Sequence, residues 1–216
     1  MNSQLFPFPG ISASLDDEAL ILRSASPLDV LSSAVVDGGF ARADVIINRH
    51  VSKYYDHPDP AAELTAFARR QGVSGPFVGL MTAVYMKNTR VVTLTEGDGH
   101  LTLVMTAGFS NATSAGLSPS VTLRPGTINL ILLIDAWLTP AAMVNAVITA
   151  TEAKTHTLRT WGLQTPDGLP ATGTSTDSVV VACTGRGPSL PYAGPATPVG
   201  HLIGRAVRQG LEASRP

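Results

Sequence analysis

An apolar run from Ile128 to Ile134 ends at Asp135, and Thr139-Pro140 then provides an N-cap residue and a first-turn proline. A long helical pattern follows. Over residues 141–150 this pattern is apolar almost all round, which predicts a helix buried inside the domain rather than one lying on its surface. We therefore expect a buried strand that leads into a buried helix at the centre of the fold.

One polar row interrupts this predicted helix. Its members follow one another at steps of four, three and four residues, so at 3.6 residues per turn they fall within one narrow arc: Asn145, Thr149, Glu152 and His156. The row faces either water or a site. Lys154 lies off the row, so Glu152 and Lys154 cannot both point straight at one centre and one of them is expected to be structural.

Shorter patterns predict the remaining elements. We expect strands over 19–22, 31–36, 45–47 and 178–183, a turn at Ser26-Pro27, an apolar segment over 77–86, a hairpin of 90–95 with 101–106, and covering helices over 60–71 and 199–211. Asp37-Gly38-Gly39 indicates a positive φ, a close backbone approach or a tight turn. The prediction is an α+β fold over residues 1–216, a single layered domain with a mixed, largely antiparallel sheet covered by helices.

The composition of the chain limits the classes of partner and of chemistry that we expect. The 216 residues are 44% hydrophobic and 14% charged, with a formal net charge of -1. No block of basic residues occurs, which argues against nucleic acid or an acidic membrane surface as a partner. The first residues lack a basic region and contain two prolines, so no signal peptide and a cytoplasmic location are expected. Cys183 has no second cysteine to pair with and lies in a predicted buried strand, which disfavours a nucleophilic role.

Two segments are candidates for chemistry. Residues 171–177 read ATGTSTD, and Thr174, Ser175, Thr176 and Asp177 make this loop dense in donors and acceptors for an amide or an oxyanion. Ser/Thr turns that satisfy their own backbone are the alternative. Glu152, in an apolar helix, is a candidate general acid or base, or else forms a surface pair with His156. Residues 107–116, small and hydroxylated, either approach a ligand or serve as a linker.

Other site classes have little support in the sequence. The five histidines never occur at H-x-x-H or H-E-x-x-H spacing, so a protein-bound metal is not expected. The chain also lacks a P-loop, a G-x-G-x-x-G motif and the usual hydrolase motif G-x-S-x-G. Nucleotide binding and serine-hydrolase chemistry are therefore not predicted.

Seven stretches stand out along the chain: SSAVVDGG (32–39), GLMTAV (79–84), TAGFSNATSAG (106–116), GTINLILLID (126–135), MVNAVITATEAKT (143–155), ATGTSTDSVVVA (171–182) and YAGPATPVGHLIG (192–204). In these stretches the chain resembles the adenosylcobinamide amidohydrolases of corrinoid salvage. TATEAKT and TGTSTD are the specific ones. Asp37 departs from the family pattern, which carries Asn before the two glycines.

The resemblance implies hydrolysis of the amide between aminopropanol and the corrin ring, giving adenosylcobyric acid. For the roles, we expect Glu152 or Asp177 to handle the proton and Lys154, Thr174, Ser175 or Thr176 to face the oxyanion. Replacing Glu152 by Gln or Asp177 by Asn is expected to reduce turnover by ~10² or more. No cofactor is expected, because the cobalt enters with the corrinoid substrate. A homo-oligomer is possible.

A corrin fringed with neutral amides favours Asn and aromatic contacts rather than charge. The expected substrate contacts are Asn48, Asn111, Asn129, Asn145 and Tyr192. His50 follows a strand end and either approaches the lower face of the cobalt or is a solvated loop histidine. The corrin is expected against the carboxyl end of the 128–134 strand and the 171–177 loop. Two alternatives are a non-catalytic corrinoid-binding protein and a self-processing amidohydrolase with Thr174 or Thr176 as nucleophile.

Overall fold

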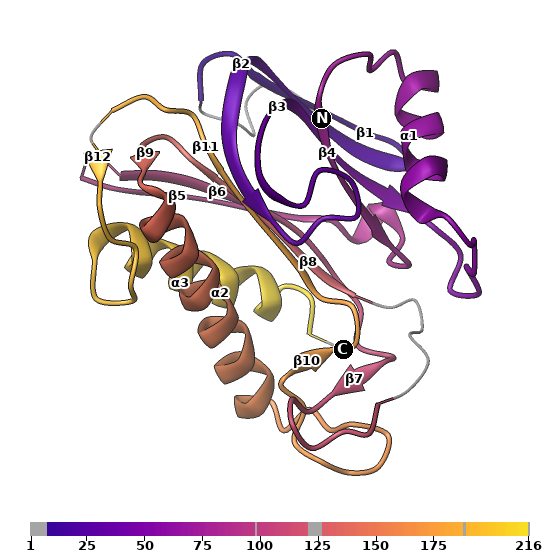
Figure 1. Cartoon of the computed structure of the whole chain (residues 1–216). Coiled ribbons are helices and arrows are strands. Elements are labelled where there is room, and N and C mark those ends of the chain that lie inside the picture. Colours follow the sequence, from indigo (N-terminus) through magenta and orange to yellow (C-terminus); the bar gives the residue numbers. More distant parts are fainter. Residues whose placement is uncertain (1–7, 98, 121–126, 188, 216) are drawn as a thin grey trace.

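The computed structural model describes residues 8–97, 99–120, 127–187 and 189–215. Within these residues, eight strands form one sheet, with the path β4-β3-β2-β11-β8-β6-β5 and with β1 paired to β2 (Figure 1). The strands of this sheet are β1 (Ile11–Leu15), β2 (Ala19–Ser32), β3 (Gly39–His50), β4 (Phe77–Thr82), β5 (Arg90–Glu96), β6 (Gly99–Ala107), β8 (Ile128–Ile134) and β11 (Ser178–Cys183).

Three α-helices and four short strands complete the described elements. The helices are α1 (Pro60–Arg70), α2 (Pro140–Thr160) and α3 (Pro198–Glu212), with a single 3₁₀ turn, η2 (Met86–Asn88), before β5. The short strands form two pairs outside the main sheet: β7 (Ala112–Thr113) with β10 (Gly173–Thr174), and β9 (Trp137–Leu138) with β12 (Ser189–Leu190). Among the described helices, none combines the length and apolar character that a membrane-spanning segment requires.

The sheet is mixed and largely antiparallel. β3 pairs with β4 and β8 with β11 in parallel, whereas the other neighbouring strands of the main sheet are antiparallel. With helices packed on it, this arrangement confirms the predicted α+β fold class.

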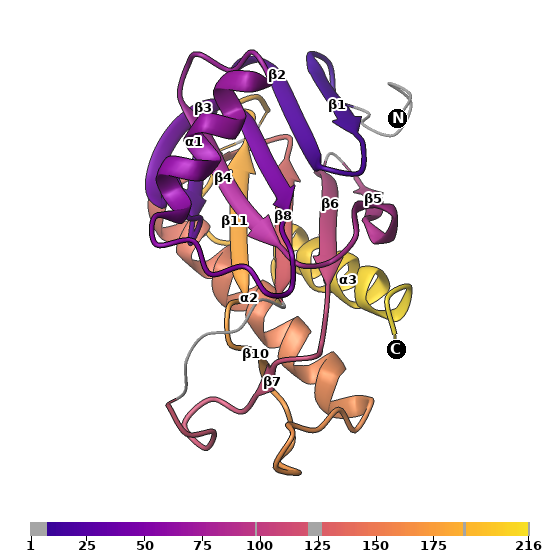
Figure 2. The same ribbon diagram turned by 90° about the vertical axis from the view of Figure 1, so that its right-hand side faces the viewer.

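The sheet also bends over itself, so that its two halves pack face to face. Leu22 of β2 and Leu80 of β4 belong to the same buried cluster as Ile131 of β8. α1 covers the outer face of β2, β3 and β4, and α2 and α3 cover the outer face of β6, β8 and β11 (Figures 1 and 2). The layers therefore run helix, sheet, sheet, helix, and the bend brings the end of β4 close to the start of β8.

The predicted strand and helix at the centre are largely as expected. All seven residues of β8 are buried. The Thr139 hydroxyl accepts a hydrogen bond from the Ala142 N–H, so α2 begins at the predicted cap. The expectation that α2 is buried all round is wrong, because Val144 and Ile148 are 46% and 47% exposed. α2 packs through its small residues and leaves one apolar side open.

The expected turn at Ser26-Pro27 is also wrong. β2 is one strand of 14 residues, and the two residues fall where its register with β3 shifts, between Arg23 and Leu28. A bulge accommodates proline because the ladder hydrogen bond that proline cannot donate is missing there. At 37–39 both the positive φ and the close backbone approach are present: Asp37 has φ 52°, Gly39 has φ 88°, and a Cβ on Gly38 would lie 2.7 Å from the Ala34 carbonyl oxygen.

Candidate active site

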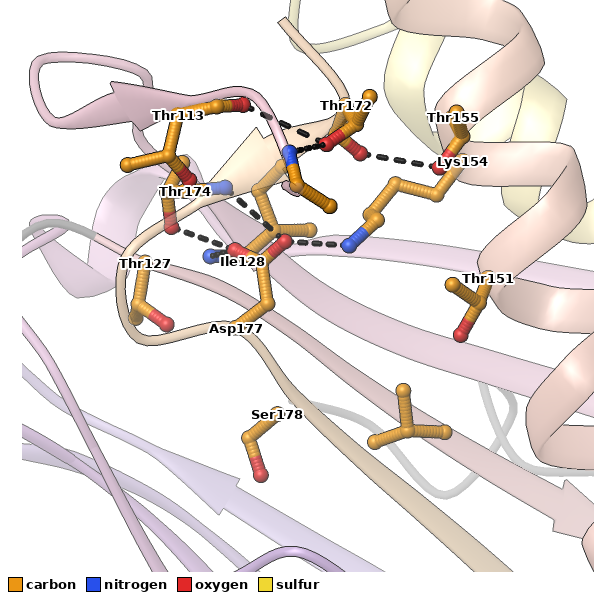
Figure 3. Close-up of polar contacts among 12 residues, drawn as sticks. Thr113, Thr127, Ile128, Thr151, Lys154, Thr155, Thr172, Thr174, Asp177 and Ser178 are labelled. Atoms are coloured by element: carbon orange, nitrogen blue, oxygen red, sulfur yellow. Dashed lines mark hydrogen bonds and ion pairs between the residues drawn. The ribbon is translucent and has the colours of Figure 1, made fainter. Parts of the chain in front are cut away.

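The carboxylate of Asp177 anchors the 171–177 loop. One oxygen, Oδ2, accepts from Lys154 Nζ and from the Thr174 N–H at 3.1 Å. The other, Oδ1, accepts from the Thr174 hydroxyl and from the Ile128 N–H at 3.1 Å (Figure 3). A carboxylate offers about four acceptor positions, so these donors occupy the whole group. Asp177 therefore ties together α2, the loop and the first residue of β8.

α2 supplies two neighbouring contacts to this loop. Besides the ion pair of Lys154, the Thr155 hydroxyl donates to the Thr172 carbonyl at 3.0 Å (Figure 3). The side chains of Lys154 and Asp177 are only 9% and 14% exposed. A Cβ on Gly173 would overlap the Asp177 carboxylate and lie 2.8 Å from Lys154 Nζ. Only glycine leaves room for the buried pair against this part of the backbone.

The outer side of the loop faces a cavity of about 700 Å³, a size typical of small-molecule sites. Ser175 and Asn111 both line it. The side-chain Nδ2 of Asn111 donates to the Ser175 hydroxyl at 2.7 Å, and the backbone N–H of Ser175 donates to the backbone carbonyl of Asn111 at 3.3 Å. The short pair of β7 and β10, beyond the end of the main sheet, holds these two segments together (Figure 2). The 107–116 segment therefore borders a hollow and does not act as a linker.

Two predicted substrate contacts, Asn48 and Asn129, lie inside the protein, each 1% exposed. Asn129 Nδ2 donates to Asn48 Oδ1 at 2.8 Å and to the Met81 carbonyl at 2.9 Å. Thr127 joins this buried network to the loop, because its hydroxyl is 3.1 Å from Asn129 Oδ1 and 2.6 Å from the Thr176 carbonyl. The hydrogen bonds of the two side-chain amides therefore join β3, β4 and β8.

Three predicted residues lie away from the loop. Glu152 is exposed, and at 3.6 residues per turn it lies roughly 160° around α2 from Lys154. Asn145 is half-buried on the same outward side of the helix. Tyr192 is 69% exposed and borders a separate cavity with His100 and Leu202. Lys154, and not the polar row, is thus the side of α2 that meets the loop.

The expected position of the loop along β8 is also corrected. β11 runs parallel to β8, and Ser178 at its start pairs with Asn129 at the start of β8. The 171–177 loop, which precedes β11, therefore lies at the amino end of β8 and not at its carboxyl end. The seven residues of β8 span about 20 Å at roughly 3.3 Å per residue, which separates the loop from the Tyr192 end of the molecule.

The cavity wall includes residues that the sequence did not point out. Asp167 lines it, with Oδ1 accepting a hydrogen bond from the Thr165 hydroxyl at 2.5 Å, and Ser110 and Ser118 line it as well. The run Pro166-Asp167-Gly168 has the composition of an ordinary turn, so no local pattern marked Asp167 as part of a site. Among the residues described as lining this cavity, Asp167 provides the carboxylate.

The arrangement suits the binding of a neutral polar group. Within the described residues, the Ser175 hydroxyl proton has no acceptor, so it is available to a carbonyl oxygen in the cavity.

Cys183 is 0% exposed, and burial raises the pKa of its thiol to about 12, which keeps it protonated near neutral pH. In the described part of the chain, no group of three or more His, Cys, Asp or Glu side chains is placed to hold a metal ion.

Comparison with known proteins gives a consistent family. A family model described as adenosylcobinamide amidohydrolase matches residues 10–215. A protein of that name from Methanosarcina mazei is 34% identical over 208 residues, which cover 92% of this chain and 94% of the relative. Another from Halobacterium salinarum is 37% identical over 142 residues, which cover 62% of this chain and 57% of the relative.

Among solved structures, the PH0078 protein from Pyrococcus horikoshii OT3 is similar with a TM-score of 0.51 and 10% sequence identity. The match covers 96% of this chain and 79% of that one. At this identity the likeness concerns the fold alone.

Proposed function

Because the chain belongs to the adenosylcobinamide amidohydrolase family, we propose that it cleaves the amide that joins aminopropanol to the corrin ring of adenosylcobinamide. Water adds to the amide carbon, the carbon–nitrogen bond breaks, and adenosylcobyric acid and aminopropanol leave. The reaction serves corrinoid salvage in cobalamin synthesis, in the cytoplasm. The observation that carries this proposal is the family match, which extends over residues 10–215.

The cavity beside the 171–177 loop is the proposed place of the scissile amide. Its walls carry hydroxyl and carboxamide groups, including Ser175, Asn111 and Thr113, and one carboxylate. Such walls match a substrate whose rim consists of neutral amides, because each amide needs one donor and one acceptor rather than a counter-charge.

We assign the roles from the hydrogen-bonding and charged groups that each side chain does not already use within the protein. The Ser175 hydroxyl, with its proton available, donates to the carbonyl oxygen as it becomes an oxyanion. Asp167, a carboxylate at the cavity wall, takes the proton of the attacking water and passes it to the leaving amine. Asp177 and Lys154 are positioning residues, because their charges are spent on each other and on the backbone that holds Ser175.

Incubation of the purified protein with adenosylcobinamide, followed by chromatography of the corrinoids, tests the proposal. Release of adenosylcobyric acid together with free aminopropanol is the expected result. The Ser175→Ala and Asp167→Asn variants should each lower kcat by ~10².

The same experiment separates the enzyme from a corrinoid-binding protein. Corrinoid that elutes with the protein and stays intact over repeated incubations would assign the chain a carrier role and overturn the amidohydrolase. A self-processing mechanism would appear as cleavage of the chain near Thr174 or Thr176, visible in the mass of the intact protein.

A further inference from the structure

His50, the last residue of β3, is held in the form that suits a metal ligand. Its Nδ1 lies 3.1 Å from the Val84 carbonyl. Because a carbonyl only accepts hydrogen bonds, Nδ1 carries the proton, and in the neutral ring the lone pair is then on Nε2. Metal-binding histidines commonly donate their second N–H in this way, which fixes the orientation of the ring.

The Nε2 atom itself is available. It makes no hydrogen bond within the described part of the chain, and it is not one of the buried polar atoms without a partner there. The ring of Tyr85, 64% exposed, lies beside the imidazole with the centroids 5.1 Å apart and the planes tilted by 35°. The imidazole is therefore oriented from two sides, and the nitrogen that can bind a metal has no hydrogen-bond partner among the described residues.

The described residues do not form a protein metal site around His50. Among the described residues, no three His, Cys, Asp or Glu side chains are close enough together to hold an ion. A single imidazole cannot bind a free metal ion tightly, but it can complete the coordination of a metal that brings its own ligands. The cobalt of a corrinoid is such a metal, because the corrin ring occupies its four equatorial positions.

The location of His50 also fits, because a short series of contacts leads from it to the loop. Val84, which accepts the bond from His50, packs against Gly108, where a Cβ would lie 2.9 Å from Val84 Cγ2. The Gly108 N–H donates to the Thr127 carbonyl at 3.0 Å, and the Thr127 hydroxyl reaches the Thr176 carbonyl. His50 is thus linked to the 171–177 loop, which borders the candidate cavity, through Val84, Gly108 and Thr127.

We propose that Nε2 of His50 binds the lower axial position of the corrinoid cobalt and holds the ring while its amide arm reaches the cavity. The proposal rests on the proposed function, which supplies the corrinoid. Cobinamide has no nucleotide base, so water occupies this position in solution. In the binding step this water leaves as the Nε2 lone pair forms the new bond, and the oxidation state of the cobalt does not change.

The test uses the intact protein and two probes. With cob(II)inamide, electron paramagnetic resonance of the complex should show the hyperfine splitting of one axial nitrogen, and isotopic labelling of histidine nitrogen should alter that splitting. With adenosylcobinamide, the visible absorption band should move to longer wavelength on binding, as expected when nitrogen replaces water.

Three variants assign the nitrogen. The His50→Asn side chain can still donate to the Val84 carbonyl but has no ligand nitrogen, so it should bind a water-coordinated corrinoid with the nitrogen splitting lost. The His50→Gly variant with added imidazole should regain the splitting. His156→Gln, an exposed histidine on α2, is the matched control and should behave like the wild type.

The outcomes separate this proposal from the proposed function. If the wild-type complex shows only water-coordinated cobalt, or if His50→Asn keeps the nitrogen splitting, His50 is not the ligand, even where adenosylcobyric acid is still released. If the nitrogen signal is present and depends on His50 but no cleavage occurs, the ligand assignment stands and the amidohydrolase proposal fails.

Discussion

At the scale of single residues, Asp177 and Glu152 differ in what surrounds them. The Asp177 carboxylate holds four donors, whereas Glu152 is exposed on the far side of α2. We predict that Asp177→Asn lowers turnover by ~10², because the amide cannot accept from all four donors and the loop that carries Ser175 shifts. Steady-state kinetics with adenosylcobinamide measure this effect.

Glu152→Gln is the matched variant, and its position leads us to expect near-normal kcat and KM. A loss of ~10² in this variant would restore Glu152 as the proton-handling residue that the sequence suggested and would contradict an active site at the 171–177 loop. Circular dichroism should show both variants to be folded, so that a lost activity is not a lost fold.

The glycine beneath the ion pair gives a second prediction. In Gly173→Ala the added methyl would overlap the Asp177 carboxylate, so the Lys154–Asp177 pair must move. We expect a stability loss of about 1–3 kcal/mol, the usual cost of overpacking, measured by urea unfolding. Gly75→Ala serves as the control, since its Cβ would meet its nearest neighbour at an ordinary 3.7 Å. Equal stability of the two variants would mean that the pair is not tightly packed.

Part of the site could be predicted from the sequence. The convergence of α2 with the 171–177 loop was expected, and Lys154, Thr174 and Asp177 do meet there. The side of α2 that faces the loop was not predicted. The polar row indicated the side of Glu152, whereas the contact is made by the long side chain of Lys154 on the opposite side. Asn48 and Asn129 are polar residues whose partners come from distant strands, so no local pattern shows that they are satisfied inside.

At the scale of elements, α1 is joined to β3 by a polar cluster. Arg49 Nη2 lies 2.8 Å from Glu63 Oε1, and the Tyr55 hydroxyl donates to Glu63 Oε2 at 2.5 Å. The Tyr55 hydrogen bond, followed by the Arg49 contacts, lowers the pKa of the Glu63 carboxyl below 4.5. Burial, followed by the carboxylate of Glu63, raises the pKa of the Tyr55 hydroxyl well above its usual range.

The sign of the pH dependence follows from the lowered pKa. Ionised Glu63 stabilises the fold fully above its unfolded-state pKa, near 4.5, and this contribution is lost as the pH falls through the folded-state value. We predict that Glu63→Gln lowers the free energy of unfolding by about 1–3 kcal/mol at neutral pH, with the difference shrinking in acid. Urea unfolding across pH 3 to 7, roughly the range in which carboxyls titrate, measures it.

Exposed Glu152→Gln is again the control and should leave the free energy of unfolding at neutral pH close to that of the wild type. A Glu63→Gln deficit that stays constant down to the acid end would show that packing, and not the charge, accounts for the loss.

The elements themselves were mostly predictable, because periodicity and caps are local. The hairpin of β5 and β6, the cap at Thr139 and the limits of α1 follow from short patterns. The unbroken course of β2 through Pro27 does not, because it depends on the bulge that its pairing with β3 tolerates. The exposure of Val144 and Ile148 depends on how α2 packs against its neighbours, which an apolar pattern alone does not show.

At the scale of the whole molecule, the parallel pairing of β8 with β11 places two cavities at opposite ends. The larger one adjoins Ser175 at the amino end of β8, and the smaller one, about 320 Å³, adjoins Tyr192 and includes Ile134 from the carboxyl end. Both cavities adjoin stretches that resemble the family, and the sequence alone does not show that these stretches lie at opposite ends of the molecule. The separation became evident only with the direction of β11.

This separation gives a prediction about where the substrate binds. If the scissile amide lies at the amino end of β8, Tyr192→Ala should leave kcat and KM for adenosylcobinamide within about twofold, because roughly 20 Å separate the two ends at the strand rise. Asn111→Ala should raise KM or lower kcat by at least about tenfold, since it removes the donor that orients Ser175. The kinetics of both variants decide between the two ends of β8. A loss of activity confined to Tyr192→Ala would move the catalytic site to the smaller cavity. Losses of activity in both variants would mean that one corrinoid spans a path along the molecule that the two cavities do not reveal.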